Sequence, residues 1–291
     1  MLFGIFNKLQ GLTASSLTQV AVFLKRMTAL RPADAGSVAP DSTERFEIKY
    51  SCDPLDLTLI DSIVRCHPAA FSKTYPTRLV NSIYFDHTGL RNLHDNVAGL
   101  AERSKLRARW YGPDATRAQL TIEYKAKQGM IGTKDTFKLS QPVDLTQCDW
   151  RTLTKKMLEE APNHFLPMIR DAEQPIVFVR YERDYFGSAN GKLRLTVDRA
   201  ITAFDQAGSP RPNLRHPVAT EPVAVIEFKG AAADRDQLAK ACSLFPLRPS
   251  AHSKYVTAVE AITADALDGG LEIDVAARAV RAQSPIGVAS S

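Results

Sequence analysis

The stretch RSKLRARWYG, residues 103–112, places a basic residue at every second position. The basic residues are Arg103, Lys105, Arg107 and Arg109, and apolar or small residues stand between them. Side chains of a β-strand alternate between its two faces. The spacing therefore predicts a strand that has one strongly cationic face and one largely apolar face.

Seven further segments are predicted as strands, and most of them repeat this alternation of charged and apolar residues. They are RFEIKY (45–50), LVNSIYFD (79–86), LTIEYKAK (120–127), TKDTFKLS (133–140), IVFVRYERDYF (176–186), KLRLTVD (192–198) and AVIEFKG (224–230). Period-two patterning of this kind indicates antiparallel strands with one buried face.

The charge on the polar faces of these strands is unusually one-sided. The faces carry the cations Arg45, Lys49, Arg103, Lys105, Arg107, Arg109, Lys125, Lys127, Lys134, Lys138, Arg183, Lys192, Arg194 and Lys229 and the anions Glu47, Glu123, Asp198 and Glu227. This set has a net charge of +10, whereas the whole chain has +5. Like charges opposite one another destabilise a sheet, so we expect a negatively charged ligand to offset them.

A closed antiparallel barrel gives such faces a common interior. We therefore expect an α+β protein in which about eight strands form a closed barrel with flanking helices. Phosphate chains suit the interior, because arginine binds phosphate oxygens in bidentate fashion and lysine acts as a point charge. Among the acids, Glu227 and Glu47 are candidates to hold a divalent cation that bridges phosphates. Salt-bridge partnership is the alternative for both, and Asp198 is expected to orient Arg194.

Helices are predicted between and after the strands. Asp53 followed by Pro54 indicates a helix start, with Leu55, Leu59, Ile63 and Val64 on one face. Residues 144–170, 234–245 and 251–264 are also expected to be helical. We divide the chain into an N-terminal extension and linker (1–43), one domain (44–262) and a mobile tail (263–291).

The composition restricts location and partners. Four widely spaced cysteines without a CxxC pair favour a reducing, cytoplasmic setting. The sequence contains no run of about 18 apolar residues, so it predicts no membrane span. The apolar and basic residues 1–31 leave contact with a membrane surface or a membrane-protein partner open. Nucleic-acid binding is not expected, because Trp110 and Tyr124 fall on the face opposite the cations.

Taken together, the motifs resemble the polyphosphate polymerase domain of the vacuolar transporter chaperone (VTC) complex, within the CYTH-like triphosphate tunnel enzymes. The resemblance covers about residues 44–262 and rests on the order of nine motifs. These are RFEIKY, SIYFD (82–86), KLRARWYG (105–112), IEYKAK (122–127), the pair Lys134 and Lys138, YERDYF (181–186), LRLTVD (193–198), VIEFKG (225–230) and HSKY (252–255).

The resemblance implies an eight-stranded tunnel in which the γ-phosphate of ATP is added to a growing polyphosphate chain with the help of Mn²⁺ or Mg²⁺. It implies Glu227 as a metal ligand, beside the candidate Glu47, and Arg107, Arg109, Lys125 and Arg183 at the transferring phosphate. Further phosphate contacts are expected from Arg45, Lys49, Arg103, Lys105, Lys127, Lys134, Lys138, Arg194, Lys229, Ser253 and Lys254.

One departure bears on the reaction. Hydrolytic members open with E-x-E-x-K, whereas this chain has Arg45 in place of the first acid. A cation therefore replaces a metal ligand, which favours the polymerase over the hydrolase. A non-catalytic module that binds polyphosphate or inositol polyphosphate, and an inorganic triphosphatase, remain as alternatives.

Overall fold

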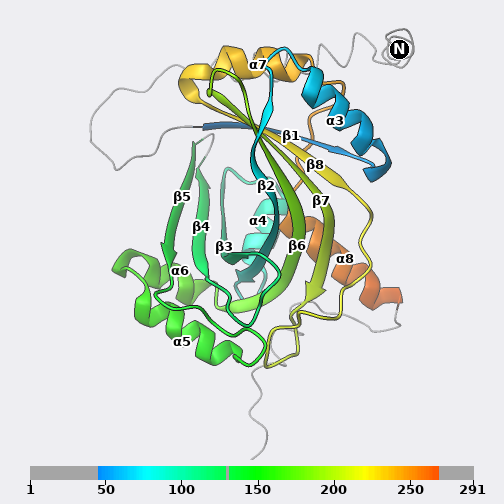
Figure 1. The fold of residues 1–291 in the computed structure, drawn as a ribbon. Coiled ribbons are helices and arrows are strands. Elements are labelled where there is room, and N and C mark those ends of the chain that lie inside the picture. Colours follow the sequence, from blue (N-terminus) through cyan, green and yellow to red (C-terminus); the bar gives the residue numbers. More distant parts are fainter. Residues whose placement is uncertain (1–44, 129–130, 269–291) are drawn as a thin grey trace, which may run out of the picture. The chain divides into compact units, whose positions relative to one another are not determined.

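The computed structural model describes residues 45–128 and 131–268 and contains an antiparallel sheet of eight strands with flanking helices (Figure 1). The strand order is β1-β8-β7-β6-β2-β3-β4-β5. The strands are β1 (Arg45–Cys52), β2 (Ser72–Asp86), β3 (Glu102–Tyr111), β4 (Thr121–Gln128), β5 (Ile131–Lys138), β6 (Gln174–Gly187), β7 (Leu193–Asp205) and β8 (Ala224–Ala231). The α+β class is confirmed. In the described residues the order ends at β1 and β5, so the closed barrel is not confirmed.

Each predicted segment forms a strand, and β2 and β7 extend well beyond their predicted lengths. The chain forms two compact units. Unit 1 contains the described residues up to Thr77 together with Arg183–Arg199 and Val223–His252. Unit 2 contains Arg78–Glu182, Ala200–Pro222 and the described residues from Ser253 onward.

The core of unit 1 lies on one face of β1, β8 and β7. Their alternate residues Ile48, Phe228 and Leu195 are buried and occupy directly opposed positions on the three strands. Two helices, α3 (Leu57–Cys66) and α7 (Arg235–Ser243), contribute Ile60, Val64, Leu238 and Ala241 to the same cluster. The apolar residues of the predicted alternation are therefore those that pack against the helices.

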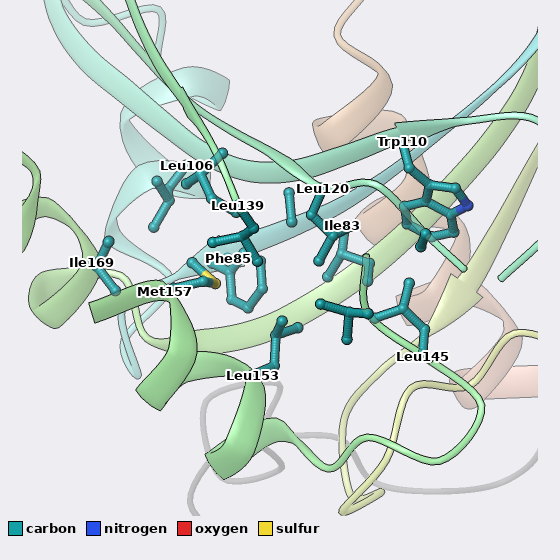
Figure 2. Close-up of a cluster of buried hydrophobic side chains, with 14 of the residues drawn as sticks. Ile83, Phe85, Leu106, Trp110, Leu120, Leu139, Leu145, Leu153, Met157 and Ile169 are labelled. Carbon is teal, nitrogen blue, oxygen red and sulfur yellow. The ribbon is translucent and has the colours of Figure 1, made fainter. Parts of the chain in front are cut away.

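Unit 2 has an equivalent apolar face on β2, β3 and β4. Leu106, Ala108 and Trp110 of β3 are fully buried here. They pack with α5 (Trp150–Glu160) and α6 (Leu166–Asp171), which the short 3₁₀ helix η2 (Asn163–Phe165) connects. Figure 2 shows side chains of this cluster, including Leu153 and Met157 of α5.

A second cluster of unit 2 involves α8 (Lys254–Asp268), which packs on residues of β2 and β6. Tyr255, Ala258, Val259 and Ile262 of α8 are buried against Val80, Tyr84, Val177, Val179 and Tyr181. Tyr84 and Tyr181 have the same strand parity as the polar residues Ser82 and Arg183. The helix therefore brings its first turn to the polar side of these strands.

The helix after β1 differs from its sequence-based prediction. Asp53 caps the 3₁₀ helix η1 (Pro54–Asp56), because its side chain accepts a 2.8 Å hydrogen bond from the Leu55 amide. However, Leu55 is 90% and Leu59 37% exposed, whereas Ile60 is 1% exposed. The predicted apolar face is thus wrong for Leu55 and Leu59, because the tighter first turn shifts the phase of the helix that follows.

Two other helices differ from the expectation. The short helix α4 (Arg91–Val97) was not predicted, and its sequence has no strong apolar period. The remaining 3₁₀ helix, η3 (Ala232–Asp234), leads into α7. Helix α8 runs to Asp268, so residues 263–268, which we assigned to the tail, are helical.

The predicted N-terminal extension, the linker and the rest of the tail lie outside the described residues. Within the part of the chain that the structure describes, no helix is long and apolar enough to cross a bilayer.

The corrected face of α3 can be tested by truncating two side chains separately. Ile60→Ala should lower the free energy of unfolding by about 2–5 kcal/mol, because it leaves a cavity in the core of unit 1. Leu55→Ala should change it by less than about 0.5 kcal/mol, because the side chain lies in solvent. Urea unfolding measures both values, and equal losses would contradict the assignment.

Candidate functional site

The row of cations on β3 lies on the face opposite the unit 2 core, as the alternation predicts. Arg107 and Arg109 are nonetheless 8% and 7% exposed, so both guanidinium groups are largely removed from water. A buried charge is strongly unfavourable unless it is paired and hydrogen-bonded. The partners of these two arginines therefore define the centre of the site in unit 2.

Glu123 of β4 is the carboxylate that both arginines share. It lies directly opposite Arg107, whose Nε donates to Glu123 Oε2 at 2.7 Å and whose Nη2 contacts the same oxygen. Arg109 Nη1 lies 3.6 Å from that oxygen, and Lys134 of β5 donates to Oε1 at 2.9 Å. Glu123 is 3% exposed, so one buried acid offsets three cations.

Burial alone would raise the pKa of Glu123, but Arg107, Arg109 and Lys134 outweigh it and hold the pKa far below its ordinary value of 4.5. The carboxylate therefore stays ionised at any physiological pH. Sequence reasoning counted Glu123 among the acids of the polar faces but gave it no role. Its position opposite Arg107 depends on strand register, which the sequence alone does not fix.

Three hydroxyl groups complete the surroundings of the two arginines. Arg107 Nη1 donates to Tyr84 Oη at 3.1 Å, and Arg109 donates to Ser82 Oγ and Tyr181 Oη, both at 3.2 Å. Burial would raise the pKa of Tyr84, but Arg107 and Arg109 outweigh it, and the pKa is lowered. The sequence showed these residues on the correct face without indicating that they bind the arginines.

Three lysines of neighbouring strands lie directly opposite one another on this face. Lys125 of β4 is paired in register with Lys105 of β3 and with Lys134 of β5. Like charges in such positions destabilise a sheet. Lys105 donates to Ser253 Oγ at 2.9 Å, and Lys254 Nζ lies 4.9 Å from the centre of the Tyr181 ring. The first turn of α8 thus brings two predicted residues to this row.

The remaining predicted cations of unit 2 lie further along the strands. Arg103 is opposite Lys127, and its Nη1 donates to the carbonyl oxygen of Leu100 at 2.5 Å. Lys127 is opposite Gly132 on its other side. Lys138 is exposed and opposite Thr121. These residues flank the centre formed by Arg107, Arg109 and Glu123.

Unit 1 contains a second polar constellation, on the face of β1, β8 and β7 opposite its core. Register places Lys229 between Glu47 and Arg194, and Glu227 between Lys49 and Thr196. Lys229 Nζ forms ion pairs with Glu227 Oε1 and, at 3.3 Å, with Glu47 Oε2, while Lys49 Nζ lies 2.6 Å from Glu47 Oε1. Arg45 stands at the start of β1, opposite Ala231. The two predicted metal ligands are therefore neighbours on adjacent strands.

The acids of this constellation differ in burial. Glu227 is 6% exposed, and burial would raise its pKa, but Lys229 and Lys49 outweigh it and hold the pKa well below its ordinary value. For Glu47, burial and the nearby Glu227 would raise the pKa, but Lys49 and Lys229 outweigh them, and the pKa is lowered. Both carboxylates are therefore ionised and available as oxygen ligands.

Asp198 makes a contact that was not predicted. It is fully buried and forms a bidentate pair with Arg183, with Nε to Oδ1 at 2.5 Å and Nη2 to Oδ2 at 2.7 Å. This contact fixes Arg183, and the expectation that Asp198 orients Arg194 stays a prediction. The residue spacing could not distinguish the two arginines, because Arg183 lies on another strand.

The carboxylate oxygens in unit 1 suit a divalent cation that phosphate oxygens also coordinate. Mg²⁺ commonly binds one or two carboxylates together with substrate phosphates, and Glu227 and Glu47 can supply these. The Thr196 hydroxyl, opposite Glu227, is buried and lacks a hydrogen-bond partner among the described residues. Within these residues no group of three or more His, Cys, Asp or Glu side chains could hold a metal by itself. The described residues therefore do not surround a metal ion with protein ligands alone.

The role of Glu123 as the shared counter-charge can be tested by replacement and by pH. Glu123→Gln should lower the free energy of unfolding by about 3–5 kcal/mol at neutral pH, because it leaves buried guanidinium groups unpaired. The folded-state pKa lies below the unfolded-state value of about 4.5. The stabilisation is thus complete above that value and is lost as pH falls below it.

The difference between wild type and Glu123→Gln in urea unfolding should therefore be constant near neutral pH and narrow in acid. Glu159→Gln is the matched control, because its side chain is 62% exposed and, among the described residues, pairs only with Lys155 four residues earlier on α5. It should change stability by less than about 0.5 kcal/mol. A difference that grows in acid would contradict the ionised state of Glu123.

Comparisons with known proteins agree with the resemblance seen in the sequence. No curated protein sequence matches the chain. Among solved structures, the PH1819 protein of Pyrococcus horikoshii OT3 shares 12% identity at a TM-score of 0.40, covering 73% of this chain and 97% of its own. A proposed adenylate cyclase of Vibrio parahaemolyticus shares 14% at a TM-score of 0.40, covering 73% and 96%. Both TM-scores lie below 0.5, so we draw no conclusion from either structure.

The family comparison is more informative. The model of the VTC domain matches residues 44–263, which is most of the 291-residue chain and contains all the strands described above. These boundaries nearly coincide with the segment that the nine motifs cover. The protein belongs to the VTC domain family.

Proposed function

We propose that this protein is a polyphosphate polymerase, which transfers the γ-phosphate of ATP to the end of an inorganic polyphosphate chain. The observation that carries the proposal is the pair of buried arginines, Arg107 and Arg109, beside three lysines in direct register. On this face the cations outnumber the single buried acid Glu123, and a chain of phosphates would complement the excess positive charge. Membership of the VTC domain family supports this class of ligand over other polyanions.

The reaction requires positioning and charge stabilisation more than covalent chemistry. A terminal oxygen of the polyphosphate attacks the γ-phosphorus of ATP, the bond from that phosphorus to the β,γ-bridging oxygen breaks, and ADP leaves. The attacking oxygen is already anionic, so the protein need not remove a proton. The rate then depends on fixed cations that stabilise the charge on the transferring group.

Each predicted residue has a role in this proposal. Arg107, Arg109, Lys125 and Arg183 contact the transferring phosphoryl group. Glu123 and Asp198 hold the guanidinium groups of Arg107, Arg109 and Arg183 in fixed orientations, so that little reorganisation is needed during the reaction. The residues proposed to bind the other phosphates are Arg45, Lys49, Arg103, Lys105, Lys127, Lys134, Lys138, Arg194, Lys229, Ser253 and Lys254.

Glu227 and Glu47 are the residues that would hold Mn²⁺ or Mg²⁺, and the bound ion would neutralise charge on phosphate oxygens. Lys229 contacts both carboxylates in the free protein and would then be released to bind phosphate. The closed tunnel belongs to the proposal as well. Its support is the family resemblance and the one-sided charge of the strand faces.

A second function is favoured by a specific observation. Glu227 and Glu47 are both paired with lysines, so their charge is offset within the protein without a metal ion. A module that binds polyphosphate or inositol polyphosphate without catalysis would need no metal. An inorganic triphosphatase is less favoured, because Arg45 replaces the first acid of the hydrolytic motif.

Incubation of the full chain with ATP and Mn²⁺, followed by gel staining for polyphosphate, separates these functions. Chain growth supports the polymerase. Binding of tripolyphosphate without growth supports the binding module, and release of phosphate from tripolyphosphate supports the hydrolase.

The Glu227→Gln variant tests the metal ligand. It should abolish ATP-dependent chain growth but leave tripolyphosphate binding without metal unchanged or stronger, because a negative charge is removed from the site. Glu159→Gln should grow chains at the wild-type rate. Thermal unfolding checks that the variant is folded, and normal chain growth by folded Glu227→Gln would refute the metal assignment.

A further inference from the structure

The first turn of α8 is attached to the polar face of unit 2 through one buried hydrogen bond. Tyr255 Oη donates to Asp86 Oδ2 at 2.5 Å, and both residues are at most 1% exposed. Burial and the adjacent Asp86 raise the pKa of Tyr255, so its hydroxyl keeps the proton that it donates. The contact joins the end of β2 to a helix that begins 168 residues later in the chain.

Asp86 is itself firmly fixed. Its Oδ1 accepts from the amides of His87 and Asn92 at 2.7 and 2.9 Å, and its Oδ2 accepts from the Leu93 amide at 2.9 Å. Asn92 in turn accepts a 2.9 Å hydrogen bond from Ser104 of β3. The carboxylate therefore connects β2, the start of α4 and, through α4, the strand that carries Arg107 and Arg109.

The ring of Tyr255 makes a second contact with the same region. It stacks on the Tyr84 ring at a centroid distance of 5.1 Å and an angle of 19°. Tyr84 is the residue whose hydroxyl accepts from Arg107. Tyr255 therefore touches both the anchor Asp86 and a direct neighbour of the buried arginine.

The two residues immediately before Tyr255 are those with proposed phosphate contacts. Ser253 Oγ accepts from Lys105 Nζ at 2.9 Å, and Lys254 Nζ lies over the Tyr181 ring, whose hydroxyl accepts from Arg109. Neither contact by itself holds a helix, because a lysine side chain is long and flexible. The Tyr255–Asp86 pair is a buried hydrogen bond that fixes this turn to the sheet, in addition to the apolar packing of the helix.

We propose that Tyr255 and Asp86 are positioning residues, which hold Ser253 and Lys254 against the row of cations so that both bind the same phosphate chain as Lys105 and Arg109. This inference rests on the proposed function, because it assigns Ser253 and Lys254 to phosphate. It adds a role for two residues that were not predicted to contact the ligand. Without the Tyr255–Asp86 hydrogen bond, Ser253 and Lys254 are still present but less firmly positioned. Phosphate binding is then weaker, because it must also order these two side chains.

The Tyr255→Phe variant tests the link, because it removes the hydroxyl and keeps the stacked ring. Calorimetric titration of the full chain with tripolyphosphate should show a dissociation constant raised about tenfold. Tyr111→Phe is the matched control, because it removes the hydroxyl of a side chain that is 52% exposed, and it should bind as wild type. Val259→Ala controls for destabilisation of α8, since Val259 is buried in the same cluster, and it should lower the melting temperature without changing affinity.

A double-mutant cycle decides whether Tyr255 acts through its neighbours. In a Ser253→Ala, Lys254→Ala background, Tyr255→Phe should have no further effect on the affinity. A tenfold loss that persists in this background would overturn the inference, as would a Tyr255→Phe variant that melts earlier but binds normally. If wild type itself fails to bind tripolyphosphate, the proposed function fails as well, whereas normal wild-type binding with an unaffected Tyr255→Phe refutes the positioning role alone.

Discussion

The polar face of unit 2 depends on the pairing of buried guanidinium groups with a single carboxylate. Arg107 and Arg109 are too deeply buried to rely on water, and Glu123 is the acid that meets both. Burial alone would raise the pKa of Glu123, but Arg107, Arg109 and Lys134 lower it and keep the carboxylate ionised. Two strongly cationic groups are thereby held in fixed orientations, which is what recognition of phosphate oxygens requires. A surface on which solvent supplied the counter-charge would leave these side chains mobile.

In unit 1 the balance of charge is different. Glu47, Lys49, Glu227 and Lys229 form a compact group in which acids and lysines alternate across β1 and β8. Each carboxylate is ionised because of the lysines, and each lysine has a nearby acid. Such an arrangement can exchange partners: a divalent cation can take the carboxylates while phosphate takes the lysines. The two constellations thus suit different parts of the chemistry proposed here.

The sequence predicted the strands well because period two is a strong signal when one face is apolar and the other charged. Leu106 and Trp110 lie in the core while Arg107 and Arg109 lie on the opposite face, as alternation requires. What could not be predicted depends on register and on distant contacts. Three of the contacts that could not be predicted join separate elements: Glu123 with Arg107, Asp198 with Arg183, and Tyr255 with Asp86. The predicted apolar face of the helix after β1 was wrong, because the 3₁₀ turn η1 shifts the phase of α3 and leaves Leu55 exposed.

The register of Lys105, Lys125 and Lys134 has a consequence for handling the protein. Most surface charge networks are attractive, and added electrolyte weakens them. Along this ladder the three ammonium groups repel one another, while Lys134 also attracts Glu123. Added salt screens the repulsion as well as the attraction, so ionic strength should affect this part of the fold less than it affects a network of purely attractive pairs.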